Sequence, residues 1–216
     1  MMKLCIIGSG SQARYVIENI RHSDNYHLEG LVDIEKRENV GNVVNGAKII
    51  CILDDIDKYF SPSEVYLVIA YGNNQKKQEI ALSLEKSNYR FATIVNKTAY
   101  ISSNVEIGKD CIINANVTIM PNTKIGDHVI IHSGCVIEHD NIIDDFANIA
   151  PGVITAGNVK IGKGSYIYTG TSIIPKTKIG NWAVVGAGSV VLKNVADNDV
   201  VAGVPAVSIK QNESKK

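Results

Sequence analysis

Large aliphatic side chains return at every sixth position of the chain from residue 101 onward. Sixteen consecutive positions keep this phase without an insertion, and fifteen of them are Ile or Val. Six residues make about one and two-thirds turns of α-helix, so a helix would scatter these side chains around its surface. An extended chain keeps even-spaced residues on one face, so the pattern predicts short strands joined by tight corners. The sixteen positions are Ile101, Ile107, Ile113, Ile119, Ile125, Ile131, Ile137, Ile143, Ile149, Thr155, Ile161, Ile167, Ile173, Ile179, Val185 and Val191.

A second series of positions, four residues after each of the first, carries mostly small side chains. It runs from Val105 to Val195 and contains Val, Cys, Thr, Ala and Ser, with one asparagine, Asn141. A large side chain at one place and a small one at another suits the interior of a stack of similar coils. Such coils cannot bury a core singly, so stacking on neighbours supplies the stability.

The first 90 residues follow a different pattern, in which short apolar runs alternate with helical segments. Strands that alternate with helices predict a small parallel sheet covered on both faces. The first strand leads into a glycine-rich turn at residues 8–13 (GSGSQA), which opens a helical stretch. The expected strands are residues 3–7, 28–33, 48–53 and 65–70, and the expected helices end at Ile20 and Leu84.

Composition and charge exclude several classes of protein. The 216 residues carry 22 basic and 22 acidic side chains, so we expect no nucleic acid or membrane partner bound through bulk charge. The chain has no apolar run of about 18 residues, as a spanning helix would need. The apolar run at residues 4–7 is too short for a signal peptide. The four cysteines lack CxxC spacing, which favours reduced thiols in a cytoplasmic protein over a disulfide or zinc framework.

The repeat over residues 101–196 resembles the hexapeptide-repeat left-handed parallel β-helix. In that family three hexads make one triangular coil, which implies about five coils here. The whole chain resembles the sialic-acid O-acetyltransferase and nucleotide-activated amino-sugar N-acetyltransferase family, in which a small nucleotide-binding domain precedes the β-helix. The segments that match are the glycine-rich turn, the strand ending in Asp33, and residues 69–74, 136–140, 149–152 and 202–206.

The resemblance implies a domain organisation and an assembly. An α/β Rossmann-like domain over residues 1–90 would bind the nucleotide sugar, and a left-handed β-helix over residues 91–210 would carry the acetyltransferase. Residues 211–216 form a polar tail. A homotrimer is implied as well, because in this family each coenzyme site is completed by a neighbouring chain.

The resemblance places the catalytic base at His139. A sugar amine is largely protonated at neutral pH, so a base must take its proton as it attacks the acetyl thioester, and histidine is suited to this task. The neighbouring carboxylate of Asp140 would orient the imidazole and raise its basicity. The residues alone equally allow a solvated corner histidine at this position.

Two other histidines compete with His139 for a role in chemistry. His128 and His132 occupy ordinary positions of the repeat, and we expect them to be surface or lining residues. A zinc site built from all three, as in the hexapeptide-repeat carbonic anhydrases, would need a cross-subunit spacing that this sequence lacks. No metal is therefore expected.

Acetyl-CoA is the implied cosubstrate, with its pantetheine lying along backbone amides between adjacent β-helices. The positions carried over from the family are Asn148, Thr169, Gly186 and Ala187. Relatives often carry histidine where this chain has Asn148, whose amide can still donate a hydrogen bond to the acetyl carbonyl oxygen. Gly186 would allow the chain to approach the ligand closely. Each of these residues can also be a plain member of the repeat.

The glycine-rich turn has two interpretations. GxGxxA after a strand, with an acidic residue about twenty positions further on, is the dinucleotide fingerprint and would favour NAD. The resemblance instead implies the diphosphate and ribose of a nucleotide sugar, held by backbone N–H groups at the same helix N-terminus. Gly8, Gly10, Ser11 and Gln12 would face the diphosphate, and Asp33 and Gly72 the nucleoside.

The hypothesis from the sequence is an acetyl-CoA-dependent N-acetyltransferase that acts on a nucleotide-linked amino-deoxysugar, expected to be a 4-amino sugar, in surface-glycan biosynthesis. The first alternative is an O-acetyltransferase acting on sialic acid or another hydroxyl acceptor. The second is a non-catalytic sensor that binds a nucleotide sugar or NAD.

Overall fold

The computed structural model describes residues 1–21, 23 and 25–211 and divides them into two compact units. The first unit runs from Met1 to Lys97, and the second begins at Thr98. Of the expected polar tail, only Gln211 is among the described residues; 212–216 lie outside them. No helix in the described part of the chain is long and apolar enough to cross a membrane.

The first unit is built on a sheet with strand order β3-β4-β2-β1-β5-β6. All neighbouring strands run parallel except β3 and β4, which form an antiparallel hairpin that the sequence pattern did not predict. The four predicted strands are confirmed as β1, β2, β4 and β5. The bounds are β1 Met2–Ile7, β2 Tyr26–Asp33, β3 Val43–Val44, β4 Ala47–Ile52, β5 Tyr66–Ile69 and β6 Arg90–Phe91.

The central strands are continuous apolar runs because helices cover both faces of a parallel sheet. The last four residues of β1, Leu4 to Ile7, are 0% exposed. The helices are α1 Ser11–Ile20, α2 Ile56–Tyr59 and α3 Asn74–Lys86, with short 3₁₀ turns at Arg37–Asn39 and Leu53–Asp55. Both predicted helices are therefore confirmed, and α3 starts where the Asn73 side chain accepts a hydrogen bond from the Lys76 N–H.

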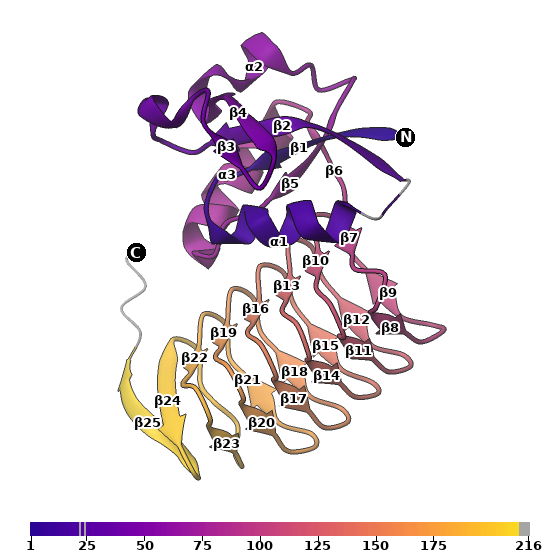
Figure 1. Cartoon of the computed structure of the whole chain (residues 1–216). Helices are drawn as coiled ribbons and strands as arrows, with labels where there is room; N and C mark the ends of the chain where they lie inside the picture. The colour runs from indigo at the N-terminus through magenta and orange to yellow at the C-terminus, as the bar shows by residue number, and fades with distance from the viewer. Residues whose placement is uncertain (22, 24, 212–216) are drawn as a thin grey trace. The chain divides into compact units, whose positions relative to one another are not determined.

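The second unit is a left-handed β-helix whose two-residue strands form three parallel sheets (Figure 1). Paired residues are eighteen apart, as Ile113, Ile131 and Ile149 show, so three hexads make one coil as predicted. One sheet has the order β23-β20-β17-β14-β11-β8, a second β21-β18-β15-β12-β9, and a third contains β10, β13, β16, β19, β22, β24 and β25. Strand β7, Ile94–Val95, falls within the first unit. The strand bounds of the second unit are β8 Tyr100–Ile101, β9 Glu106–Ile107, β10 Ile112–Ile113, β11 Thr118–Ile119, β12 Lys124–Ile125, β13 Ile130–Ile131, β14 Val136–Ile137, β15 Ile142–Ile143, β16 Asn148–Ile149, β17 Ile154–Thr155, β18 Lys160–Ile161, β19 Tyr166–Ile167, β20 Ser172–Ile173, β21 Lys178–Ile179, β22 Val184–Val185, β23 Val190–Val191, β24 Asp199–Gly203 and β25 Ala206–Gln211.

The small side chains of the second series do more than fill space. Cys135 Sγ donates to the carbonyl oxygen of Ala150 at 3.1 Å, and Ser165 Oγ donates to that of Gly180 at 2.7 Å. Each acceptor lies fifteen residues after its donor, on the next coil. A short polar side chain at this position therefore satisfies a corner carbonyl that the strands leave unpaired.

The corners impose a left-handed backbone at every sixth residue, which accounts for the many Asn, Asp and Gly residues of the repeat. Fifteen consecutive corner positions have φ between 53° and 72°. Three of them hold side chains that rarely adopt this conformation, namely Phe146, Lys176 and Trp182. The corner positions are Asn104, Asp110, Asn116, Asn122, His128, Gly134, Asp140, Phe146, Gly152, Asn158, Gly164, Gly170, Lys176, Trp182 and Gly188.

The last coil ends in an antiparallel hairpin of β24 and β25. β24 continues the stack by pairing in parallel with β22, with Val184 opposite Val200. The sequence pattern did not predict this hairpin, because the six-residue phase ends before it.

Candidate active site

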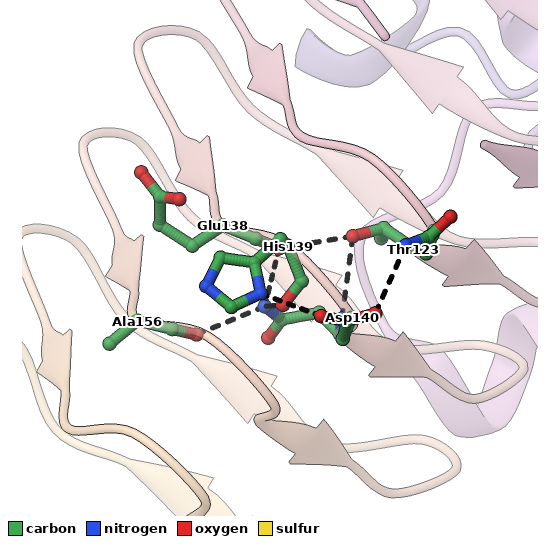
Figure 2. A network of polar contacts seen from close by, with 7 residues as sticks. Thr123, Glu138, His139, Asp140 and Ala156 are labelled. Carbon is green, nitrogen blue, oxygen red and sulfur yellow. Dashed lines mark hydrogen bonds and ion pairs between the residues drawn. The ribbon is translucent and has the colours of Figure 1, made fainter. Parts of the chain in front are cut away.

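His139 and Asp140 form an ion pair at the corner between β14 and β15. His139 Nδ1 lies 2.6 Å from Asp140 Oδ2, and the histidine side chain is 53% exposed. Asp140 occupies a left-handed corner position with φ of 58°. Asn122, one coil earlier, donates from Nδ2 to the other carboxylate oxygen at 3.2 Å. Figure 2 shows the imidazole beside Asp140, as the expected orienting role requires.

The electrostatics of the pair favour an ionised carboxylate. The hydrogen bond from His139, together with that from Asn122, holds the pKa of Asp140 below its ordinary value. With Nδ1 directed at the carboxylate, the tautomer that donates from Nδ1 leaves the Nε2 lone pair to accept a proton. The arrangement can therefore act as an oriented general base.

A buried asparagine, Asn141, anchors the backbone under the histidine. Its Nδ2 lies 2.5 Å from the carbonyl oxygen of Glu138, 3.0 Å from that of Ala156 and 3.3 Å from that of His139. The Thr123 hydroxyl donates to the Glu138 carbonyl oxygen at 3.0 Å. These contacts tie the peptide groups around His139 to the coils on both sides.

The two competing histidines are buried, so of the two expected placements, surface or lining, the surface one is wrong. His128 is 2% exposed, its Nδ1 lies 2.8 Å from Asp110 Oδ2, and its ring stacks on Phe146 with centroids 4.6 Å apart. Burial lowers the pKa of His132, although the neighbouring Asn148 side chain acts in the opposite direction. Among the described residues, no three His, Cys, Asp or Glu side chains are grouped as metal ligands.

Three of the four residues predicted to bind acetyl-CoA lie on adjacent coils of the β-helix. Thr169 and Ala187 occupy the same corner of consecutive coils, and Gly186 directly precedes Ala187. Asn148 lies in β16 with its side chain fully buried against His132. Thr169 and Ala187 are exposed at the corners that follow β19 and β22. A β-carbon on Gly186 would lie 2.8 Å from Cβ of Ala202, so close packing within the chain already requires a glycine there. Contact of these four residues with the cofactor stays a prediction.

The first unit contains an open cleft of about 430 Å³ at the carboxyl ends of its central strands. It is lined by the start of α1, by the loop after β2 and by the loop after β5. Helix α1 starts at Gly10 without a side-chain cap and without an acidic residue in its first turn, among the residues described. Its first N–H groups therefore suit an anion. The cleft brings together the predicted residues Gly10, Ser11, Gln12, Asp33 and Gly72.

Asp33 is present in the cleft wall, but its own chain uses its carboxylate. Oδ1 accepts from the backbone N–H groups of Glu35 and Lys36 at 3.1 and 2.8 Å, and Oδ2 accepts from Asn39 Nδ2 at 2.9 Å and from the Ser9 hydroxyl. Burial raises the pKa of Asp33, but these hydrogen bonds outweigh it, so the pKa lies below the ordinary value. A carboxylate has about four acceptor sites, and all four are used. Asp33 is thus placed to shape the loop after β2.

Close packing requires a glycine at position 8. Its φ is 119°, and a β-carbon there would lie 2.6 Å from the carbonyl oxygen of Ala70. Gly8 therefore lets the turn pass close to the end of β5, and the cleft lining does not include it.

Several residues around both sites were missed by the sequence reasoning. Lys36, Asn39 and Tyr71 line the cleft. They follow the ends of parallel strands, where ligands of open α/β sheets bind, and that position was the available signal. Asn122 and Asn141 support His139, and the eighteen-residue spacing would have pointed to Asn122 as the neighbour of Asp140.

Comparison with known families matches both units. Residues 3–84 match the PglD N-terminal domain, and residues 104–139 and 158–193 match the bacterial transferase hexapeptide repeat. A serine acetyltransferase from Buchnera aphidicola is 46% identical over 56 residues, which are 26% of this chain and only 20% of the relative's length.

Solved structures resemble nearly the whole chain. A mutant perosamine N-acetyltransferase from Caulobacter crescentus, in complex with CoA and GDP-perosamine, is 25% identical with a TM-score of 0.91, covering 98% of both chains. The acetyltransferase domain of PglB from Neisseria gonorrhoeae, in complex with acetyl coenzyme A, is 27% identical with a TM-score of 0.89, covering 96% of this chain and 98% of the other. The chain belongs to the hexapeptide-repeat acyltransferases that carry a PglD-type N-terminal domain.

Proposed function

We propose that this chain transfers an acetyl group from acetyl-CoA to the amine of a nucleotide-linked amino-deoxysugar, a 4-amino sugar, in surface-glycan biosynthesis. The observation that carries the proposal is the half-exposed His139 with its Nδ1 held by Asp140. The likeness to a perosamine N-acetyltransferase that binds CoA and GDP-perosamine supports the choice of substrates.

The proposed reaction uses His139 as general base. The sugar ammonium first loses one proton to solvent. Nε2 then accepts a second proton from the neutral amine as nitrogen attacks the thioester carbonyl carbon, so that an N–C bond forms. The tetrahedral intermediate then collapses, the C–S bond breaks, and the departing thiolate of CoA takes the proton back. Asp140 stabilises the imidazolium that exists between the two steps, which is where its ionised state contributes most.

The cleft of the first unit is proposed to hold the nucleotide. Backbone N–H groups at the start of α1 would bind the diphosphate, and Lys36 adds a positive charge to the cleft wall. The NAD alternative is less well supported, because the acidic residue of the dinucleotide fingerprint must accept from the ribose hydroxyls. Asp33 already accepts four hydrogen bonds from its own chain.

A homotrimer is proposed to form along the sheet that contains β14, β17, β20 and β23. Ile154 on β17 is 49% exposed, and Ile174 and Leu192, which directly follow β20 and β23, are 38% and 47% exposed. An exposed apolar strip of this kind marks an association surface. Replacing Leu192 by Glu should shift the sedimentation coefficient from trimer to monomer, and an unchanged value would contradict this interface.

The four cysteines are free and buried, which supports the proposed cytoplasmic setting. Nucleotide sugars and acetyl-CoA are cytoplasmic metabolites, so the proposed substrates agree with this placement.

The test of the proposed function is a thiol-release assay with acetyl-CoA and UDP-, dTDP- and GDP-linked 4-amino and 3-amino sugars. We expect release with one 4-amino sugar, and a loss of about 100- to 10,000-fold in kcat for His139→Ala. His128→Ala is not a clean control because that residue is buried, so His27→Ala in the first unit serves instead. Release only with sialic acid or another hydroxyl acceptor would favour O-acetylation. Tight NADH binding in calorimetry without acetyl-CoA binding, or full activity of His139→Ala, would overturn the proposal.

A further inference from the structure

The ring of His139 lies against the next coil at a place where that coil has no side chain. Gly157, eighteen residues after His139, occupies the same position one coil further on. A β-carbon built on Gly157 would lie 2.5 Å from His139 Cε1, 2.6 Å from Nε2 and 3.2 Å from Cδ2. Carbon atoms pack at about 3.5 to 4.0 Å, so even one methyl group is too large for this space.

The backbone gives no reason for a glycine at this position. Gly157 has φ outside the left-handed region, unlike the glycines at corner positions 152 and 164. An L-amino acid could therefore adopt the same conformation. Other glycines of the repeat that lie outside the corner positions, such as Gly162 and Gly180, would drive a β-carbon into backbone atoms. At Gly157 the nearest atoms all belong to the His139 ring.

The coils on both sides hold the rest of the histidine. The N–H of Asn158 donates to the His139 carbonyl oxygen at 3.0 Å, and Asn141 Nδ2 donates to the same oxygen at 3.3 Å. The backbone therefore cannot retreat from an added methyl group, whereas the half-exposed ring can rotate away. Rotation would break the 2.6 Å contact between Nδ1 and Asp140.

We infer that Gly157 is a positioning residue for His139. Because Gly157 has no side chain, the imidazole can lie against the backbone of the next coil. In this position Nδ1 contacts Asp140, and Nε2 lies over Gly157. This inference rests on the proposed role of His139 as the base. It also predicts that a side chain at residue 157 lowers kcat and leaves the fold intact.

The experiment is a double-mutant cycle with Gly157→Ala and His139→Ala. In the wild-type background, Gly157→Ala should lower kcat by about 10- to 100-fold, because a base displaced by about 1 Å loses that much. KM for acetyl-CoA and for the sugar should stay within about twofold, and the melting temperature should be equal or higher, since Gly→Ala at an ordinary φ restricts the unfolded chain. In the His139→Ala background the same change should have no further effect.

A second measurement does not depend on catalysis. The Cε1–H resonance of His139, identified by its disappearance in His139→Ala, should move in Gly157→Ala as it does in Asp140→Asn. If the wild type acetylates no acceptor, the proposed function fails, while this resonance still decides the role of Gly157. An unchanged kcat with an unmoved resonance, an equal loss in both backgrounds, or a Gly157→Ala chain that does not fold would each overturn the inference.

Discussion

Thr155 is the single break in the interior column of isoleucines and valines, and its replacement by valine should stabilise the protein. The side chain is fully buried in β17, between Ile137 and Ile173 on the neighbouring strands. Within the described residues, Thr155 Oγ1 has no hydrogen-bond partner. The hydroxyl therefore loses its hydrogen bonds to water on folding and gains none in exchange.

The size of the effect follows from this environment. A buried polar group without a partner costs about 1 to 3 kcal/mol. Valine replaces the hydroxyl by a methyl group of similar shape, so the change opens no cavity and leaves the coil spacing intact. For a chain of this size, 1 kcal/mol corresponds to about 2 to 4 °C in melting temperature. Thr155→Val should therefore raise the melting temperature by about 2 to 12 °C.

The assay is differential scanning calorimetry at one fixed protein concentration, because association makes the melting temperature depend on concentration. Thr171→Val is the matched control. That hydroxyl donates to the carbonyl oxygens of Tyr168 and Gly186 at 2.8 and 3.2 Å, so its loss should destabilise the protein. If Thr155→Val lowers the melting temperature as Thr171→Val does, the hydroxyl is hydrogen-bonded and the reasoning is refuted.

Three further predictions concern the candidate sites. Asp140→Asn removes the negative charge beside the imidazolium, and kcat should fall by about 10- to 100-fold, less than for loss of the base itself. Asn141→Thr keeps a hydrogen-bond donor for the next coil but loses the contact with the His139 carbonyl oxygen, so kcat should fall severalfold at nearly unchanged stability. The control is Ser165→Ala at another corner, which should lower the stability and leave kcat unchanged. Asp33→Asn should make the free energy of unfolding less dependent on pH in the acid range. Because its folded pKa lies below the unfolded value of about 3.9, ionised Asp33 stabilises the fold above that pH and ceases to do so as the pH falls through the folded pKa.

Each of these predictions has a result that contradicts it. Equal kcat values for Asp140→Asn and wild type would show that the carboxylate neither orients nor stabilises the imidazole. A loss of kcat in Ser165→Ala as large as that in Asn141→Thr would mean that general loosening of the coils, and not the histidine backbone, is responsible. Urea unfolding of Asp33→Asn that tracks the wild type from pH 6 to pH 3 would contradict the linkage.

The interior of the β-helix could be predicted from the sequence because every coil presents the same space to be filled. One branched aliphatic shape at Ile113, Ile131 and Ile149 repeats with the coil, so the period is visible in the residues themselves. The strands of the first unit were visible for a related reason. A strand such as β1, buried on both faces, must be apolar without interruption.

The remaining features depend on contacts that a periodic pattern does not contain. His128 looked like an ordinary corner residue, and its burial follows from Asp110 and Phe146, which stand eighteen residues away on either side. Asp33 had the spacing of a ligand to ribose, but the four donors that surround it come from the turn before it and the loop after it. In both cases the partners of a polar side chain are set by three-dimensional proximity.

The eighteen-residue spacing also explains how a regular scaffold can hold a catalytic group. Two supports of the pair stand one coil away: Asn122 reaches Asp140 from the coil before, and Gly157 leaves room for the ring on the coil after. The position equivalent to His139 holds Pro121 one coil before and Pro175 two coils after, and neither side chain can exchange a proton. The corner at His139 thus differs from its neighbours by a few side chains on an unchanged backbone, and the rigidity that a positioned base requires comes from the stack itself.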